Sequence, residues 1–88
     1  METFRDDDGG YRAWIYANPS GRVVNAERNP KPGNLILHTA MCDTITPATD
    51  RPCTTGDYFK ICALKRYELD EWARSLGGRL TECTFCGP

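Results

Sequence analysis

Two short pairs of metal-binding side chains constrain the fold of this 88-residue chain more than any other feature. His38 and Cys42 form the first pair, within H-T-A-M-C, and Cys83 and Cys86 form the second, within C-T-F-C-G-P. Imidazole and thiolate are preferred zinc ligands, and two such pairs complete a tetrahedral shell. The pattern predicts one zinc ion held by all four residues. Because the shell leaves no position open for water, the expected role of the metal is structural and not catalytic.

The length of the chain makes such a metal important for folding. At 88 residues it is a single domain, residues 1–88, in the size range where a hydrophobic core alone is marginal. Zinc contributes on the order of 10–16 kcal/mol in small zinc-finger peptides. We therefore expect the metal-free protein to be largely unfolded.

The cysteine content and the first residues favour metal binding over disulfides. The chain has five cysteines, and its acidic start, M-E-T-F-R-D-D-D, lacks the apolar segment of a signal peptide. No stretch approaches the roughly 20 apolar residues of a membrane span. We expect a cytoplasmic protein with reduced thiols and no membrane partner. A redox role for the Cys83–Cys86 pair is less favoured, because redox C-x-x-C motifs open a helix and Gly87-Pro88 follow here.

The choice of ligands depends on how one histidine and two other cysteines are interpreted. His38 is the only histidine, and its place after an apolar strand and four residues before Cys42 favours a ligand role. Cys62 could replace it in an all-cysteine set, although a buried, apolar free cysteine is the interpretation we favour. Cys53, between Pro52 and Thr54, is expected to be an exposed bystander.

Residues 1–34 are predicted to form a helix, a turn, a strand and a loop. The acidic run at 6–8 can cap a helix, and Tyr11, Trp14 and Ile15 follow at the spacing of one helical face. Residues 18–21 form a turn, 22–26 a short strand, and the prolines within 28–34 exclude regular structure.

Residues 35–88 are predicted to carry the metal. A strand over 35–38 delivers the histidine, residues 43–56 form an exposed loop, and 58–64 form a second strand whose side chains alternate. Apolar residues at 69, 72, 73 and 76 predict an amphipathic helix that Gly77-Gly78 ends. Together these elements predict an α+β domain with a short antiparallel sheet and two helices.

The second part also resembles a known family. The runs L-H-T-A-M-C-D-T-I, E-L-D-E-W-A-R-S-L-G-G and T-E-C-T-F-C-G-P are similar to the zinc-binding domain of Ada-type DNA alkylation-repair proteins, and to its stand-alone bacterial relatives. The resemblance implies that residues 35–88 are an Ada-like metal-binding core and residues 1–34 an N-terminal extension. In the repair domain the first ligand is a cysteine that accepts a methyl group from a DNA phosphotriester. His38 stands there in this chain, so that activity is not implied.

Two functions remain after the charge and the residue types are considered. An enzyme is not expected, because there is no second histidine or nucleophile–base pair and the metal shell is closed; a small-molecule substrate is not expected either. The first candidate is a module that recognises DNA, either unmodified or modified, beside a nuclease or repair enzyme. The net charge of −1 provides no general attraction to DNA, so contacts would come from local cations. The candidate contacts are Arg22, Arg28, Lys31, Lys60, Lys65 and Arg66.

The second candidate is a zinc-stabilised module that binds a protein, either an adaptor or a small inhibitor from a mobile element. Its candidate contacts are the aromatic residues Trp14, Tyr16 and Phe85. Exposed aromatic residues without neighbouring Lys or Arg would favour this function over DNA recognition.

Overall fold

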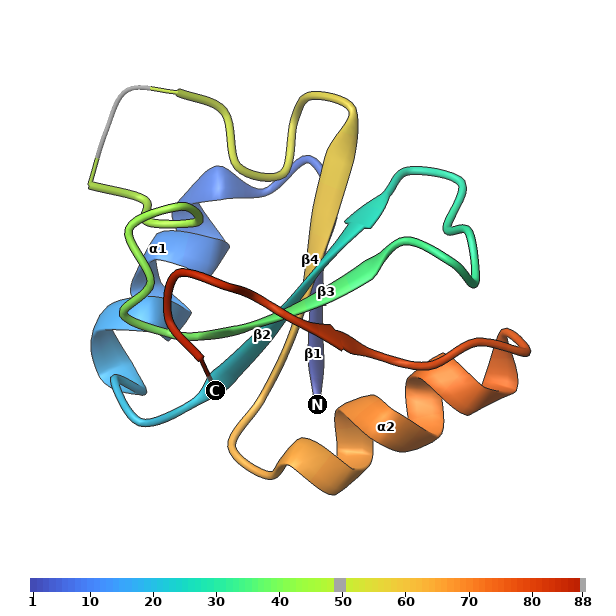
Figure 1. Ribbon diagram of the computed structural model, residues 1–88. Coiled ribbons are helices and arrows are strands. Elements are labelled where there is room, and N and C mark those ends of the chain that lie inside the picture. The colour runs from blue at the N-terminus through green and yellow to red at the C-terminus, as the bar shows by residue number, and fades with distance from the viewer. Residues whose placement is uncertain (49–50, 88) are drawn as a thin grey trace.

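The computed structural model describes residues 1–48 and 51–87 as two helices and one five-stranded sheet. The sheet order is β1-β4-β2-β3-β5 (Figure 1). The elements in chain order are β1 (Glu2–Phe4), α1 (Asp8–Ala17), β2 (Arg22–Glu27), β3 (Leu35–Thr39), β4 (Tyr58–Ala63), α2 (Arg66–Ser75) and β5 (Thr81–Glu82). The predicted α+β class with two helices is confirmed.

The sheet is mixed because of its last strand. Strands β1, β4, β2 and β3 pair antiparallel, as expected, whereas β5 pairs parallel with β3. Strand β2 comes from the first part of the chain and lies between β4 and β3, both from the second. Residues from both parts of the chain therefore build the centre of one sheet.

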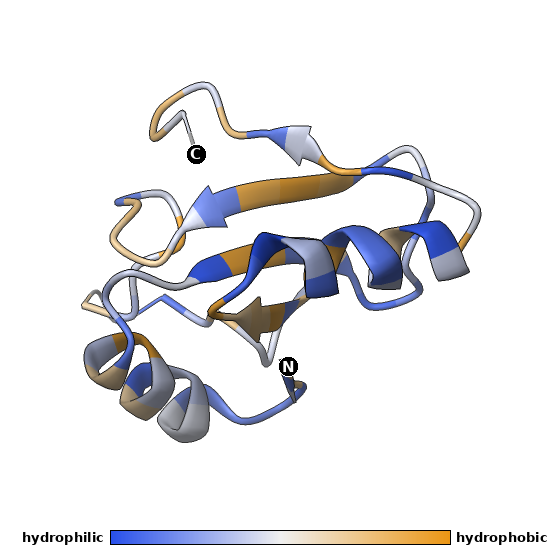
Figure 2. Ribbon diagram, turned by 90° about the horizontal axis from the view of Figure 1, so that it is seen from below, coloured by the Kyte–Doolittle hydropathy of each residue, from blue (hydrophilic) through white to orange (hydrophobic). Residues whose placement is uncertain are grey.

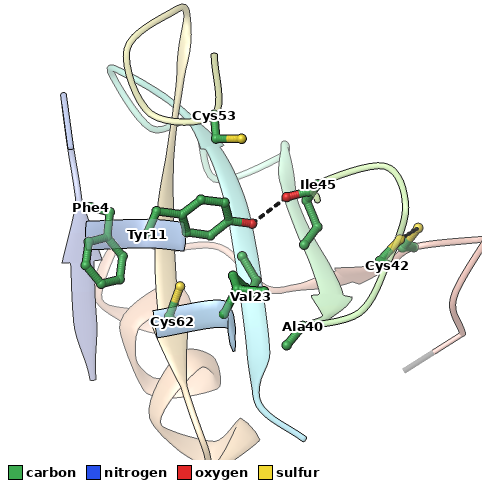
Figure 3. Close-up of a cluster of buried hydrophobic side chains, with 10 residues drawn as sticks. Phe4, Tyr11, Val23, Ala40, Cys42, Ile45, Cys53 and Cys62 are labelled. Atoms are coloured by element: carbon green, nitrogen blue, oxygen red, sulfur yellow. Dashed lines mark hydrogen bonds between the residues drawn. The ribbon is translucent and has the colours of Figure 1, made fainter. Parts of the chain in front are cut away.

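Helix α1 covers one face of the sheet. Its Tyr11 and Ile15 are buried against Val23 of β2 and Cys62 of β4, in a cluster that also contains Phe4 (Figure 3). The predicted helical face is thus confirmed, with Trp14, its third member, half-buried at the edge of the cluster. We call this group of buried residues the first core.

Helix α2 covers the opposite face. Because side chains alternate along a strand, Val24 and Ile61 point away from the first core, and they pack against Leu69 and Ala73 of α2. The outward side of α2 is mostly hydrophilic (Figure 2). Among the described residues, neither ten-residue helix has the length or apolar character needed to cross a bilayer.

The helix ends follow the expected chemistry. Asp7 caps α1, since its side chain accepts a hydrogen bond from the backbone N–H of Gly10. Asp8 does more than complement the helix dipole, because it accepts hydrogen bonds from the backbone N–H and the hydroxyl of Thr54. At the end of α2, Gly77 has φ +76°, a left-handed conformation that glycine adopts without strain.

The long segment between β3 and β4 closes the first core. Its residues Ile45 and Cys53 are both buried in the first core. The Tyr11 hydroxyl donates a 2.6 Å hydrogen bond to the Ile45 carbonyl oxygen (Figure 3). The prediction that Cys53 is exposed is wrong: only 7% of it is accessible. The segment folds back over α1, which the sequence pattern around Pro52 does not indicate.

Candidate metal centre

All four predicted ligands converge at one end of β3. The ligand atoms of His38, Cys42, Cys83 and Cys86 all lie within 4.8 Å of one another. The Cys42 and Cys83 Sγ atoms are 3.9 Å apart. A tetrahedral zinc site with Zn–S bonds of about 2.3 Å has sulfur atoms about 3.8 Å apart. The group could therefore hold a metal ion without a large rearrangement.

The pairing of β5 with β3 brings the two halves of the centre together. His38 lies in β3, and Cys42 follows after a turn in which its backbone N–H bonds to the Thr39 carbonyl oxygen. Cys83 follows β5 directly, and its N–H donates to the Leu37 carbonyl oxygen over 2.9 Å. Without this parallel pairing, the second pair of cysteines would have no fixed position near His38.

Backbone N–H groups point at two of the sulfur atoms. The N–H of Thr39 lies 3.3 Å from Cys86 Sγ, and that of Phe85 lies 3.4 Å from Cys83 Sγ. Although desolvation by burial opposes the shift, backbone hydrogen bonds from Cys86 and Phe85 lower the pKa of Cys83 to about 7. The thiolate is the form that binds metal. The turn is thus arranged to stabilise the ligand in its binding state.

Thr44 bridges the other two ligands. Its hydroxyl oxygen lies 3.0 Å from Cys42 Sγ and 3.3 Å from His38 Nδ1. Hydroxyls and carbonyls in this position commonly orient metal ligands. Burial, with a smaller effect from the charge of Lys60, lowers the pKa of His38 to about 4. The imidazole is therefore neutral at pH 7, as metal binding requires. The sequence contains no signal that singles out Thr44 from other loop threonines.

Cys62 is excluded as a replacement for His38 by the register of the sheet. Val23 pairs with His38 on one side and with Cys62 on the other, so two strand spacings, about 10 Å in total, separate the two residues. Cys62 is fully buried in the first core. The interpretation of Cys62 as a buried apolar side chain is confirmed.

The structure removes Lys60 from the candidate DNA contacts. Only 4% of Lys60 is exposed, and its Nζ donates hydrogen bonds to Asn25 Oδ1 and to the Cys53 carbonyl oxygen. The sequence alone predicts Lys60 to be one of six surface cations that could contact DNA. Its place on the α1 side of β4 buries it instead.

Two of the other candidate cations pair with acids of the same chain. Arg28 forms an ion pair with Asp6, and Arg66 forms ion pairs with Glu82 and Asp70 over 2.7 and 3.5 Å. Among the described residues, no ion pair engages the remaining candidates, which are Arg22, Lys31 and Lys65.

Two arginines that the sequence analysis missed share a cleft. Arg74 and Arg79 line a surface cleft of about 790 Å³ together with Pro32 and Gly33. Lys31 directly precedes this part of the lining in the sequence. Asp70 also lines the cleft, so its described lining has two cations and one acid. The cleft forms where the loop before β3 meets the end of α2, which no local sequence pattern indicates.

The surface beside the metal centre is apolar. Phe85, between the last two ligands, is 83% exposed, and Met41, next to Cys42, is 63% exposed. A largely apolar hollow of about 300 Å³ is lined by Phe85, Ile36 and His38, and by Thr44 and residues 81–84. No lysine or arginine lines it within the described part of the chain.

Comparison with models of known protein families, with curated proteins and with solved structures found no match. The resemblance to Ada-type domains stays a prediction from the spacing of the ligands and the order of the elements.

Proposed function

We propose that this chain is a non-enzymatic module in which one zinc ion fastens the segment after β5 to the end of β3. Three thiolates and one imidazole form a donor set that suits zinc and not magnesium or calcium, which take oxygen ligands. The close grouping of the four side chains supports this assignment. With all four positions taken by protein ligands, the metal has a structural role.

We further propose that the module recognises a protein partner through the apolar surface beside the zinc site. The observation that carries this choice is the exposed Phe85 next to a hollow whose described lining contains no lysine or arginine. Large apolar side chains are costly to leave in water, and aromatic residues are frequent binding anchors. Of the six cations expected to bind DNA, by contrast, three are unsuited to it: Lys60 is buried, and Arg28 and Arg66 are paired with acids.

An extended peptide segment is the partner that fits this surface. Strand β5 is the last strand of the sheet, so its outer edge is free to pair with an added strand. The hollow is lined by β5 itself and by the residues that follow it. A segment aligned along β5 would place an apolar side chain in the hollow, against Phe85 and Ile36.

A peptide selection tests the proposed recognition. The zinc-loaded chain is panned against random peptides displayed on phage, and retained peptides are measured against the variants Phe85→Ser and Tyr67→Ser. Tyr67 is the matched control, since it is 62% exposed on α2. We expect peptides with an apolar anchor that bind the Phe85→Ser variant at least tenfold more weakly and the Tyr67→Ser variant equally well. Failure to enrich peptides, or equal binding by both variants, would contradict the proposal.

DNA recognition is the second candidate function, and the cleft with Arg74 and Arg79 is the observation that favours it. Two adjacent guanidinium groups can contact phosphates, and such binding weakens steeply with salt. A gel-shift series at rising salt with the double variant Arg74→Gln/Arg79→Gln tests it. Arg22→Gln is the control, because Arg22 begins β2 at the far end from the loop that reaches the cleft. Binding that is unchanged in the double variant would exclude this surface.

A further inference from the structure

Lys60 is a buried ammonium group that forms no ion pair within the described part of the chain, although the charge of Asp8 acts on it from a longer distance. Its Nζ donates to Asn25 Oδ1 over 2.7 Å and to the Cys53 carbonyl oxygen over 2.6 Å, and both acceptors are neutral. Among the residues that the structure describes, no carboxylate forms an ion pair with it. Buried charges are normally paired, and an ammonium group has three N–H donors. Two donors of Lys60 are thus bonded, and the third has no hydrogen-bond acceptor among the described residues; the Tyr11 ring lies 5.8 Å from Nζ.

A pocket of about 390 Å³ lies against this group. It is lined by Lys60, Arg51, Asn25 and Thr44, and by residues 56–58. Arg51 lies at its exposed side and donates a hydrogen bond to the Asp43 carbonyl oxygen, so its guanidinium retains further donors. Lys60 and Arg51 thus bring two positive charges to one pocket, whose described lining includes a single carboxylate, Asp57.

We propose that this pocket binds a small oxyanion, a carboxylate or phosphate group on a compact molecule, between the Lys60 ammonium and the Arg51 guanidinium. The volume falls within the lower part of the range for small-molecule sites. Hydrogen bonds between charged partners are the strong ones, and the planar guanidinium can bind two oxygens at once. Desolvation by burial lowers the pKa of Lys60, which is the cost that a bound anion would offset. The pocket shares Thr44 with the hollow beside Phe85, but Lys60 and Arg51 line the pocket and do not line the hollow.

An NMR titration of the zinc-loaded full chain tests the proposal. Sodium acetate and sodium phosphate are added separately at constant ionic strength, with sodium chloride as the balancing salt. We expect saturable shifts of the Lys60 side-chain ¹⁵Nζ signal and of the Asn25 and Cys53 amides. The signal of Lys65, on the surface, should stay in place. The anion that saturates at the lower concentration identifies the preferred group, carboxylate or phosphate.

Variants then test the two proposed contacts. Lys60→Met and Arg51→Gln should each weaken anion binding at least tenfold, whereas Lys65→Met should leave it unchanged. The ¹⁵Nζ signal of the unaltered protein reports on Lys60 even if Lys60→Met does not fold. Absence of saturable shifts with both anions, shifts that chloride reproduces, or full affinity in Arg51→Gln would each overturn the proposal.

Discussion

The hydrogen bond from Tyr11 to Ile45 connects helix α1 to the segment that carries Cys42 and Thr44 (Figure 3). Tyr11 is fully buried, and Tyr11→Phe removes only its hydroxyl while the ring keeps its packing. No other donor in the described part of the chain reaches the Ile45 carbonyl oxygen. An unsatisfied buried acceptor costs about 1–3 kcal/mol. For a domain of this size, each 1 kcal/mol lowers Tm by about 4–8 °C.

Thermal and urea unfolding of the zinc-loaded variant, at one fixed concentration of free zinc, measures this effect. We expect Tyr11→Phe to lower Tm by at least about 4 °C, without a change in the urea m-value. Tyr67→Phe is the control: Tyr67 is 62% exposed, and its loss of a hydroxyl should change stability by no more than about 0.5 kcal/mol. Equal stability of the two variants would refute the argument that this hydrogen bond holds the segment on α1.

Three further predictions concern the metal, a half-buried carboxylate contact and a close backbone approach. Cys83→Ser should lose the metal and the folded circular dichroism spectrum, whereas Cys62→Ser should lose stability but keep one metal per chain; loss of metal from both would show that Cys62 is a ligand after all. Asp8→Ala should destabilise by about 2 kcal/mol at pH 7, against little change for the exposed Asp43→Ala. Hydrogen bonds from Thr54, Cys53 and Thr55 outweigh desolvation and hold the pKa of Asp8 below 3.8. Its contribution is therefore present above pH 3.8 and would be lost only in acid, where the zinc ligands are protonated as well. Urea unfolding of the zinc-loaded protein at pH 7 should accordingly show that Asp8→Asn, which keeps an oxygen acceptor but not the charge, is also destabilised; full stability of Asp8→Asn would contradict the charge-based explanation. Gly78→Ala should destabilise by about 1–3 kcal/mol, since the new Cβ would lie 2.5 Å from the Pro32 carbonyl oxygen, and Gly33→Ala, with open space around it, is the control; equal unfolding midpoints in urea would show that the loop moves freely.

The sequence was sufficient to predict which four side chains gather at the candidate metal centre, and most of the elements, because those features depend on residue types at short spacing. His38, Cys42, Cys83 and Cys86 are recognisable from their chemistry, and the periodicity of apolar residues marks both helices. The burial of Lys60 and Cys53 depends instead on the register of the sheet and on a loop that folds back over α1. Such tertiary arrangements leave no local trace in the sequence.

The two shortest strands, β1 and β5, could not be predicted from the sequence either. β1 has three residues and β5 has two, too few for an alternating pattern to be distinguished from chance. Yet β5 determines the site, because its parallel pairing with β3 places Cys83 next to His38. A metal ion bound by the four side chains would supply the energy that such a short strand lacks.

The central claim is that one zinc ion holds this fold together, and native mass spectrometry of the protein purified without added metal tests it most directly. At about 0.05–0.15 kcal/mol per residue, a chain of 88 residues has a stability of about 4–13 kcal/mol, similar to the zinc contribution of about 10–16 kcal/mol. We predict one zinc ion per chain in a narrow, folded charge-state distribution, and a shift to the high charge states of an unfolded chain once a chelator removes the metal. A metal-free chain with the same narrow distribution would contradict the account.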